Sequence, residues 1–161
     1  MTEETKLEGR RGQGDEGFTL VEIMVVVLVI GILLAIGIPT FLGARERAQD
    51  RSTQTSLRTG QTTATVLFTD DTSFTDATTA AMAAAEPSVN WLAAGTASTD
   101  DAEVSIAFTT DGTEWGAAAM SASGTCFFIH LDSGAATTYG STTTASSCTG
   151  TQALSAAGTG W

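Results

Sequence analysis

The sequence predicts an α+β fold in which a long N-terminal helix packs on a small antiparallel sheet of three to four strands. Three observations indicate this fold class. Residues 18–42 form one apolar run, residues 43–69 continue a helical pattern with one apolar stripe, and apolar residues alternate at every second position after residue 103. The 161-residue chain is long enough for one such domain together with one membrane segment.

The apolar run follows abruptly on a polar segment. Residues 1–17 contain four glycines, which disfavour a helix, whereas residues 18–42 contain a single charge, Glu22. As a helix the run would be about 37 Å long, enough to cross a hydrocarbon core of about 30 Å. A secretory signal peptide has a shorter apolar region followed by its small-residue cleavage site, but here the small residue, Gly17, precedes the run. The run is therefore predicted to be a membrane-spanning helix.

Glu22 is out of place in a membrane helix. An acid at the centre of such a helix costs about 2.5 to 3.5 kcal/mol, but Glu22 lies only about 6 Å along the axis from Phe18. It either reaches the polar interface or, if the chain is cut after Gly17, faces the new amine of Phe18 in the same layer. An amine and a carboxylate about 4 Å apart attract by about 4 kcal/mol at an effective dielectric constant near 20. Such a pair would form within one helix or between two staggered helices.

The string GFTLVE at residues 17–22, followed by the apolar run, resembles the class III signal of type IV prepilins and pseudopilins. The resemblance covers residues 17–44. It implies that residues 1–17 are a leader, removed by a membrane aspartyl peptidase that then methylates the Phe18 amine. It also implies that Glu22 pairs with the Phe18 amine of an adjacent subunit during docking. Three positions are implied to be places where the helix loosens in the filament: Gly31, Gly37 and Pro39.

Charge alone does not orient the membrane helix, because three basic residues precede it and four follow it. The resemblance implies that the leader is cytoplasmic and the rest extracytoplasmic, first as a single-pass pool in the inner (cytoplasmic) membrane and then as a cell-surface pilus. The implied partners are further copies of the chain, the prepilin peptidase and methylase, the assembly platform with its ATPase, and membrane lipid before assembly. Arg45–Arg58 is implied to lie in the packed helical core and to pair with Glu46, Asp50 or neighbouring subunits.

Residues 43–69 continue the helix in amphipathic form. Their apolar stripe, predicted to pack against a sheet, consists of Leu57, Gly60, Ala64, Leu67 and Phe68. Residues 70–102 are predicted to connect this helix to the sheet. Within them, Asp76 is predicted to cap a short helix that runs through Ala85, and Trp91 is predicted to fill the core of the head.

Residues 103–161 are predicted to form an antiparallel head with a disulfide-tied tail. The expected elements are a strand over 104–108, a turn at Asp111-Gly112, a strand over 115–121, a turn at Ser123-Gly124, a strand over 125–131 and a fourth strand around 137–139. Cys126 and Cys148 would be free thiols in the cytosol, but in an exported domain they are expected to form a disulfide. That bond would fix a tail rich in small residues, and Trp161 is expected to dock on the head or on a neighbour.

Composition excludes several functions. All seven basic residues lie in the first 58 positions, and the ten acidic residues after them make direct nucleic-acid binding unexpected. Neither acidic cluster, at 70–76 or at 100–103, has the spacing of a calcium loop, so no metal or cofactor is expected. The one histidine, His130, shares a strand face with Asp132, but no catalytic motif accompanies it. The chain is therefore not expected to be an enzyme.

Three functional hypotheses follow. The first is a structural subunit, the major pilin of a type IV pilus that serves attachment, motility or uptake. The alternative is a pseudopilin of a type II secretion or competence system, which shares the same N-terminal motif. The third is a membrane-anchored extracytoplasmic binding module that does not polymerise. The pilus is favoured because the head lacks a recognisable calcium loop and has a C-terminal cysteine pair.

Overall fold

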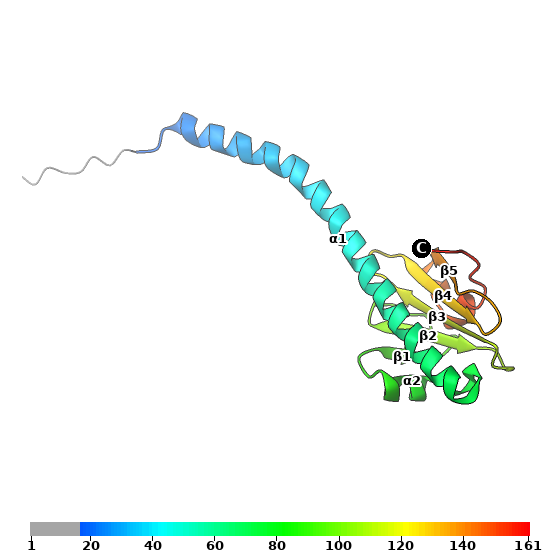
Figure 1. The fold of residues 1–161 in the computed structure, drawn as a ribbon. Helices are drawn as coiled ribbons and strands as arrows, with labels where there is room; N and C mark the ends of the chain where they lie inside the picture. Colours follow the sequence, from blue (N-terminus) through cyan, green and yellow to red (C-terminus); the bar gives the residue numbers. More distant parts are fainter. Residues whose placement is uncertain (1–16) are drawn as a thin grey trace, which may run out of the picture. The chain divides into compact units, whose positions relative to one another are not determined.

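The computed structural model describes residues 17–161, so nearly all of the predicted leader lies outside the described residues. The chain divides into two units, one ending at Thr40 and the other comprising Phe41–Trp161. Helix α1 (Leu20–Asp71) contributes to both. Figure 1 shows the second unit, in which the C-terminal part of α1 crosses a sheet. The predicted α+β fold, a long helix on a small, mostly antiparallel sheet, is confirmed.

Threonine is a poor helix former, yet α1 keeps its regular form through a threonine-rich segment. The hydroxyl groups donate hydrogen bonds to the carbonyl four residues earlier, which satisfies them without interrupting the backbone ladder. These threonines are Thr53, Thr55, Thr62, Thr63 and Thr65. The helix ends at Asp71 because Thr72 takes a left-handed conformation, with φ of 56°, and donates its N–H to the carbonyl of Phe68 at 2.7 Å.

The sheet has five strands in the order β1-β2-β3-β4-β5. They are β1 (Asn90–Leu92), β2 (Glu103–Phe108), β3 (Glu114–Met120), β4 (Cys126–Asp132) and β5 (Thr138–Thr142). Neighbouring strands from β2 to β5 pair antiparallel, as predicted, whereas β1 pairs parallel with β2. Strand β1 was missed because three residues show no alternation, and only the register of Trp91 with Val104 makes them a strand.

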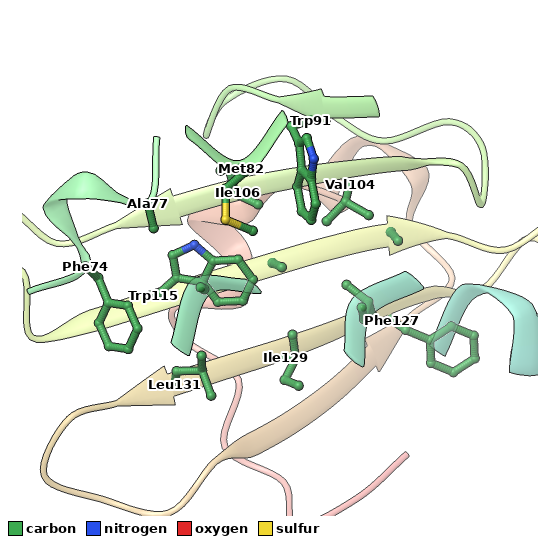
Figure 2. Packing of buried hydrophobic residues seen from close by; sticks show 14 residues of the cluster. Phe74, Ala77, Met82, Trp91, Val104, Ile106, Trp115, Phe127, Ile129 and Leu131 are labelled. Atoms are coloured by element: carbon green, nitrogen blue, oxygen red, sulfur yellow. The ribbon is translucent and has the colours of Figure 1, made fainter. Parts of the chain in front are cut away.

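One face of the sheet carries the main core, under α1. The predicted apolar stripe of α1 is confirmed: Leu57, Gly60 and Ala64 are buried, together with Thr53. In Figure 2 the side chains of Trp115, Ile129 and Leu131 project from this face, and Met82 and Trp91 close its edge.

The short helix before the sheet differs from its prediction at the N-terminus. Asp76 does not cap it but ends a separate 3-10 helix, Phe74–Asp76, whose own cap is Ser73. Helix α2 (Thr79–Ala85) is capped by the hydroxyl of Thr78, which accepts a hydrogen bond from the N–H of Ala81, and it ends where predicted. The cap differs because the chain turns a second time at Ala77, whose side chain is buried in the core.

The tail covers the opposite face of the sheet. Helix α3 (Gly150–Ala153), which was not predicted, approaches so closely that the N–H of Gly150 donates to the Ser105 hydroxyl at 2.9 Å. The expected disulfide between Cys126 and Cys148 is present, with a Cα–Cα distance of 5.6 Å, and it joins β4 to the segment before α3. The tail is therefore fixed by a helix as well as by the disulfide.

Trp161 docks on the head of its own chain, which was one of its two expected positions. Its indole N–H donates to the carbonyl of Phe128 at 2.8 Å. Its ring meets those of Phe127 and Tyr139 edge to face, with centroids 6.1 Å and 4.7 Å away. These contacts hold the last residues against β4 and β5.

Gly150→Ala is expected to destabilise the head by about 1 to 3 kcal/mol, because overpacking a closed contact forces the backbone apart. A Cβ atom at this position would overlap the carbonyl carbon of Ile106. Urea denaturation of the full chain in detergent micelles, followed by tryptophan fluorescence, measures the change. Gly95→Ala is the matched control, since a Cβ there meets nothing within 4 Å. Equal midpoints for the two variants would contradict the close approach of α3.

Removal of the disulfide by Cys126→Ala and Cys148→Ala together is expected to cost roughly 3 kcal/mol, because the closed loop restricts the unfolded chain. The two cysteines are 22 residues apart in the sequence. The same denaturation assay measures the loss, and wild-type protein with reductant provides the control. Unchanged stability in both samples would show that α3 and Trp161 hold the tail without the bond.

Candidate processing and docking site

The predicted processing site lies just before the helix. Gly17 and Phe18 precede the first residue of α1, Leu20, so the helix begins two residues later than the apolar run. The side chain of Phe18 is 75% exposed. The peptide bond between Gly17 and Phe18 is thus outside any helix or strand. Its backbone is not held in hydrogen bonds of a helix or sheet, so a peptidase could bind it. Cleavage and methylation remain predictions.

Thr19 caps α1, a role that was not predicted from the sequence. Its hydroxyl accepts a hydrogen bond from the backbone N–H of Glu22 at 3.2 Å. Thr19 and Glu22 have the spacing of a capping box, in which a Glu or Gln at the third helical position supports the cap. This signal was present in the sequence. Glu22 therefore has two candidate roles, an acid favoured by the helix N-terminus and a charge for docking.

The first part of α1 exposes its apolar side chains on all sides. Its most apolar 18-residue window has a mean hydropathy of 3.0, and none of that window is buried. By length and composition the helix can cross a membrane. A helix that is apolar all round must be covered by lipid or by protein. Among the described residues, the side chains of this stretch stay exposed.

The three predicted loosening positions lie inside a continuous helix. A Cβ atom added to Gly31 or Gly37 would meet no atom within 4 Å, and Pro39 stands within α1. Proline has no N–H to donate, so the carbonyl four residues before it loses its helical partner. Next to the proline, the hydroxyl of Thr40 donates to the carbonyl of Ile36 at 3.0 Å. Loosening in a filament remains a prediction.

The expected pairing of the arginines with Glu46 and Asp50 is not found within the chain. Among residues 17–161, no arginine has a carboxylate oxygen within 4.0 Å. Asp50 instead accepts hydrogen bonds from the hydroxyls of Ser121, at 2.7 Å, and Ser123. These serines follow β3 and bring the carboxylate to the sheet, so Asp50 fastens the helix to the head. No local pattern indicates this contact, because it joins residues about seventy positions apart.

His130 contacts a different acid from the one suggested by the sequence. Its Nε2 atom lies 3.7 Å from the carboxylate of Glu114 on β3, while its Nδ1 atom lies 3.3 Å from the hydroxyl of Thr138 on β5. That hydroxyl donates its own hydrogen to the carbonyl of Ala156. The histidine therefore lies among polar groups of β3, β5 and the tail.

Comparison with known proteins agrees with the N-terminal geometry. The family described as the prokaryotic N-terminal methylation motif matches residues 13–38. The type IV major pilin protein PilA of Myxococcus xanthus is 37% identical over 62 residues, which are 38% of this chain and 28% of that protein. No solved structure matches the chain significantly.

Two further relatives are a secretion-system protein and a pilus component. The type II secretion system core protein G of Pectobacterium carotovorum is 42% identical over 25% of this chain and 26% of that protein. The type IV wide pilus major component of Thermus thermophilus is 51% identical over 22% of this chain and 27% of that protein. The chain thus spans little more than a quarter of the length of the relatives it matches. It carries the prokaryotic N-terminal methylation motif, and its homologues are type IV pilins and type II secretion pseudopilins.

Proposed function

We propose that the chain is the major structural subunit of a type IV pilus, made as a precursor with a cytoplasmic leader and an extracytoplasmic head. A peptidase cuts it between Gly17 and Phe18 and methylates the new amine. The cut chain stays in the cytoplasmic membrane and then enters a filament through an assembly platform driven by an ATPase. The filament serves attachment, motility or uptake.

The observation that carries this proposal is the position of Glu22 as the single charge of the apolar run, residues 18–42, whose side chains are exposed. After a cut at Gly17, Glu22 is the fifth residue of the mature chain, one turn from the Phe18 amine. A helix that only anchored the head would insert better with an apolar residue in this place. If Glu22 binds the Phe18 amine of the next subunit, the cost of placing its charge in the membrane is offset in the filament. The names of two relatives, each a major pilus component, support the pilin assignment.

A specific observation favours a second candidate, a pseudopilin of a secretion system. One relative is the core protein G of a type II secretion system. Pilins and pseudopilins share the N-terminal motif, so the motif does not separate them. Electron microscopy of material sheared from cells separates the two, since long surface filaments support the pilin and their absence supports the pseudopilin.

A membrane-anchored module that does not polymerise is less favoured, because it leaves Glu22 without a role beyond the helix cap. Catalysis is also not proposed. The Nδ1 atom of His130 contacts the hydroxyl of Thr138, its Nε2 atom lies 3.7 Å from Glu114, and no catalytic motif accompanies it. The acidic head gives no support to direct nucleic-acid binding.

Glu22→Gln tests the docking charge against the capping role. Glutamine serves at the third position of a capping box as glutamate does, so a capping role predicts normal filaments. A docking charge predicts at least about a tenfold loss, because an attraction of about 4 kcal/mol at close range disappears. Counting filaments per cell by electron microscopy, with the membrane level of the subunit measured by immunoblot, gives the result.

Thr19→Ala provides the control. It removes the hydroxyl that accepts from Glu22 and costs about 1 kcal/mol at the helix N-terminus, but it leaves the charge in place. Filament numbers are expected to fall much less than in Glu22→Gln. The docking role is refuted if the glutamine variant assembles normally while Thr19→Ala does not.

Processing has its own measurement. Mass spectrometry of the mature protein is expected to find Phe18 as the first residue, with one methyl group on its amine. Gly17→Leu should block the cut, since the peptidase would meet a bulky side chain in place of hydrogen, and the leader should then remain attached. A wild-type chain that keeps Met1 would contradict the proposed precursor.

A further inference from the structure

Three arginines form a row along one flank of α1. At about 100° per residue, positions 47, 51 and 58 lie within about 40° of one another around the helix axis. All three side chains are exposed, and we call Arg47, Arg51 and Arg58 the arginine row. Like charges four residues apart, as in Arg47 and Arg51, destabilise a helix slightly. The spacing of these charges therefore does not stabilise the isolated helix.

The arginine row lacks a carboxylate partner among the residues that the structure describes. Each guanidinium group carries five N–H donors, yet none of the three donates a hydrogen bond or meets a carboxylate among the residues from 17 onward. Of the three, Arg58 makes a cation–π contact, with its Cζ atom 5.6 Å from the centre of the Trp161 ring. Stacking on a ring leaves the edge of the guanidinium free to bind an anion.

A complementary group of carboxylates stands where α1 ends. Asp70 and Asp71 are in its last turn, and Asp76 follows in the 3-10 helix; we call these three the acid corner. Negative charge is unfavourable at a helix C-terminus, and α1 has no basic residue in its last turn. The carboxyl of Asp76, by hydrogen bonding and by its charge, raises the pKa of Asp71 above its ordinary value.

The acid corner differs from the other carboxylates that follow α1, all of which except Glu114 accept a hydrogen bond from a donor outside their own group. Asp101 accepts from the hydroxyl of Ser52, and Glu103 from the N–H and hydroxyl of Thr99. The remaining ones accept from neighbouring turns or lie beside His130: Glu86, Asp100, Asp111, Glu114 and Asp132. No residue outside the acid corner donates to it within the described range. Among residues 17–161, its charges thus lack a cation.

We infer that the arginine row of one copy binds the acid corner of a second copy, as a side contact of the filament. This inference rests on the proposed function, since it requires copies to assemble. The centre of Asp70 and Asp71 lies about 170° around the helix from the centre of the arginine row. One contact uses the arginine row of one copy and the acid corner of the other. The second charge group of each copy lies on the opposite flank and stays open, so a symmetric pair cannot satisfy both groups. Such a heterologous contact repeats and builds an open polymer.

The contact also fixes the stagger between the two copies. The centres of the arginine row and of Asp70 and Asp71 are separated by about 18 residues, which is roughly 28 Å along a helix. Two parallel copies in this contact are therefore displaced by about that distance along the axis of α1. Arginine provides a planar group that binds carboxylates in pairs, so the contact specifies register as well as attraction.

Charge exchange tests the inference in full chains expressed with a type IV pilus assembly machinery. The variant Arg47→Glu with Arg51→Glu, and the variant Asp70→Arg with Asp71→Arg, are each expected to lower the yield of sheared filaments at least about tenfold, because like charges then face each other. All four substitutions in one chain are expected to restore the yield. Arg45→Glu is the matched control, since this exposed arginine lies about 140° from the centre of the row, and its yield should not change.

Stability measurements separate assembly from folding. Basic residues at the end of α1 suit the helix dipole, so Asp70→Arg with Asp71→Arg should not lower the melting temperature of the monomer in detergent. The inference is overturned if the chain with all four substitutions does not regain the filament yield, or if Arg45→Glu lowers the yield as much as the paired variants do. The proposed function still stands in either case, provided that the wild type forms filaments. If the wild type makes no filament, both the proposed function and this inference are overturned. A filament reconstruction without any contact between the arginine row and an acid corner likewise overturns the inference.

Discussion

The head depends on the close approach of α1 to the sheet at Gly60. A Cβ atom at this position would lie 3.2 Å from the ring of Trp91 and 3.4 Å from that of Trp115, closer than most side chains allow. The missing side chain lets two indole rings lie against the helix backbone, with Leu57 and Ala64 buried one turn to either side. Each buried aromatic ring removes more apolar area from water than one of the alanines that make up much of this core. Strand β1 joins the sheet at Trp91, so this contact also fixes the edge of the sheet.

The same contact explains the composition of β3 and the need for the tail. Central strand β3 has Ala117 and Ala119 facing α1, and Ala118 facing the opposite side. Small side chains let a helix approach either face, but they bury little area, so both faces must be covered. Helix α1 covers one face, and the tail covers the other through α3 and the disulfide of Cys126. The glycine that begins α3 is required for the second approach as Gly60 is for the first.

Local patterns were enough to predict the parts of the fold that depend on neighbours in sequence. The apolar stripe of α1 and the turn at Asp111-Gly112 carry their own signals, and both are present as predicted. Strand β1, helix α3 and the contact of Asp50 with Ser121 were missed because each depends on residues distant in sequence. The candidate site is the reverse case. Its motif is contiguous, so Glu22 and the predicted cleavage position follow from local sequence. The cap by Thr19 was not predicted, although its spacing is equally local.

The division of α1 argues for a filament rather than a simple anchor. The buried residues of the helix begin at Thr53, so the apolar run contributes no side chain to the core of the head. Its sequence is therefore not constrained by packing in the core of the head. Lipid and packed helices are both apolar, and most of the run suits either one. Glu22 does not, because lipid penalises a carboxylate that an amine on a neighbouring helix would stabilise. The arginines farther along α1 follow the same argument in water, because residues 17–161 hold their charges without pairing them.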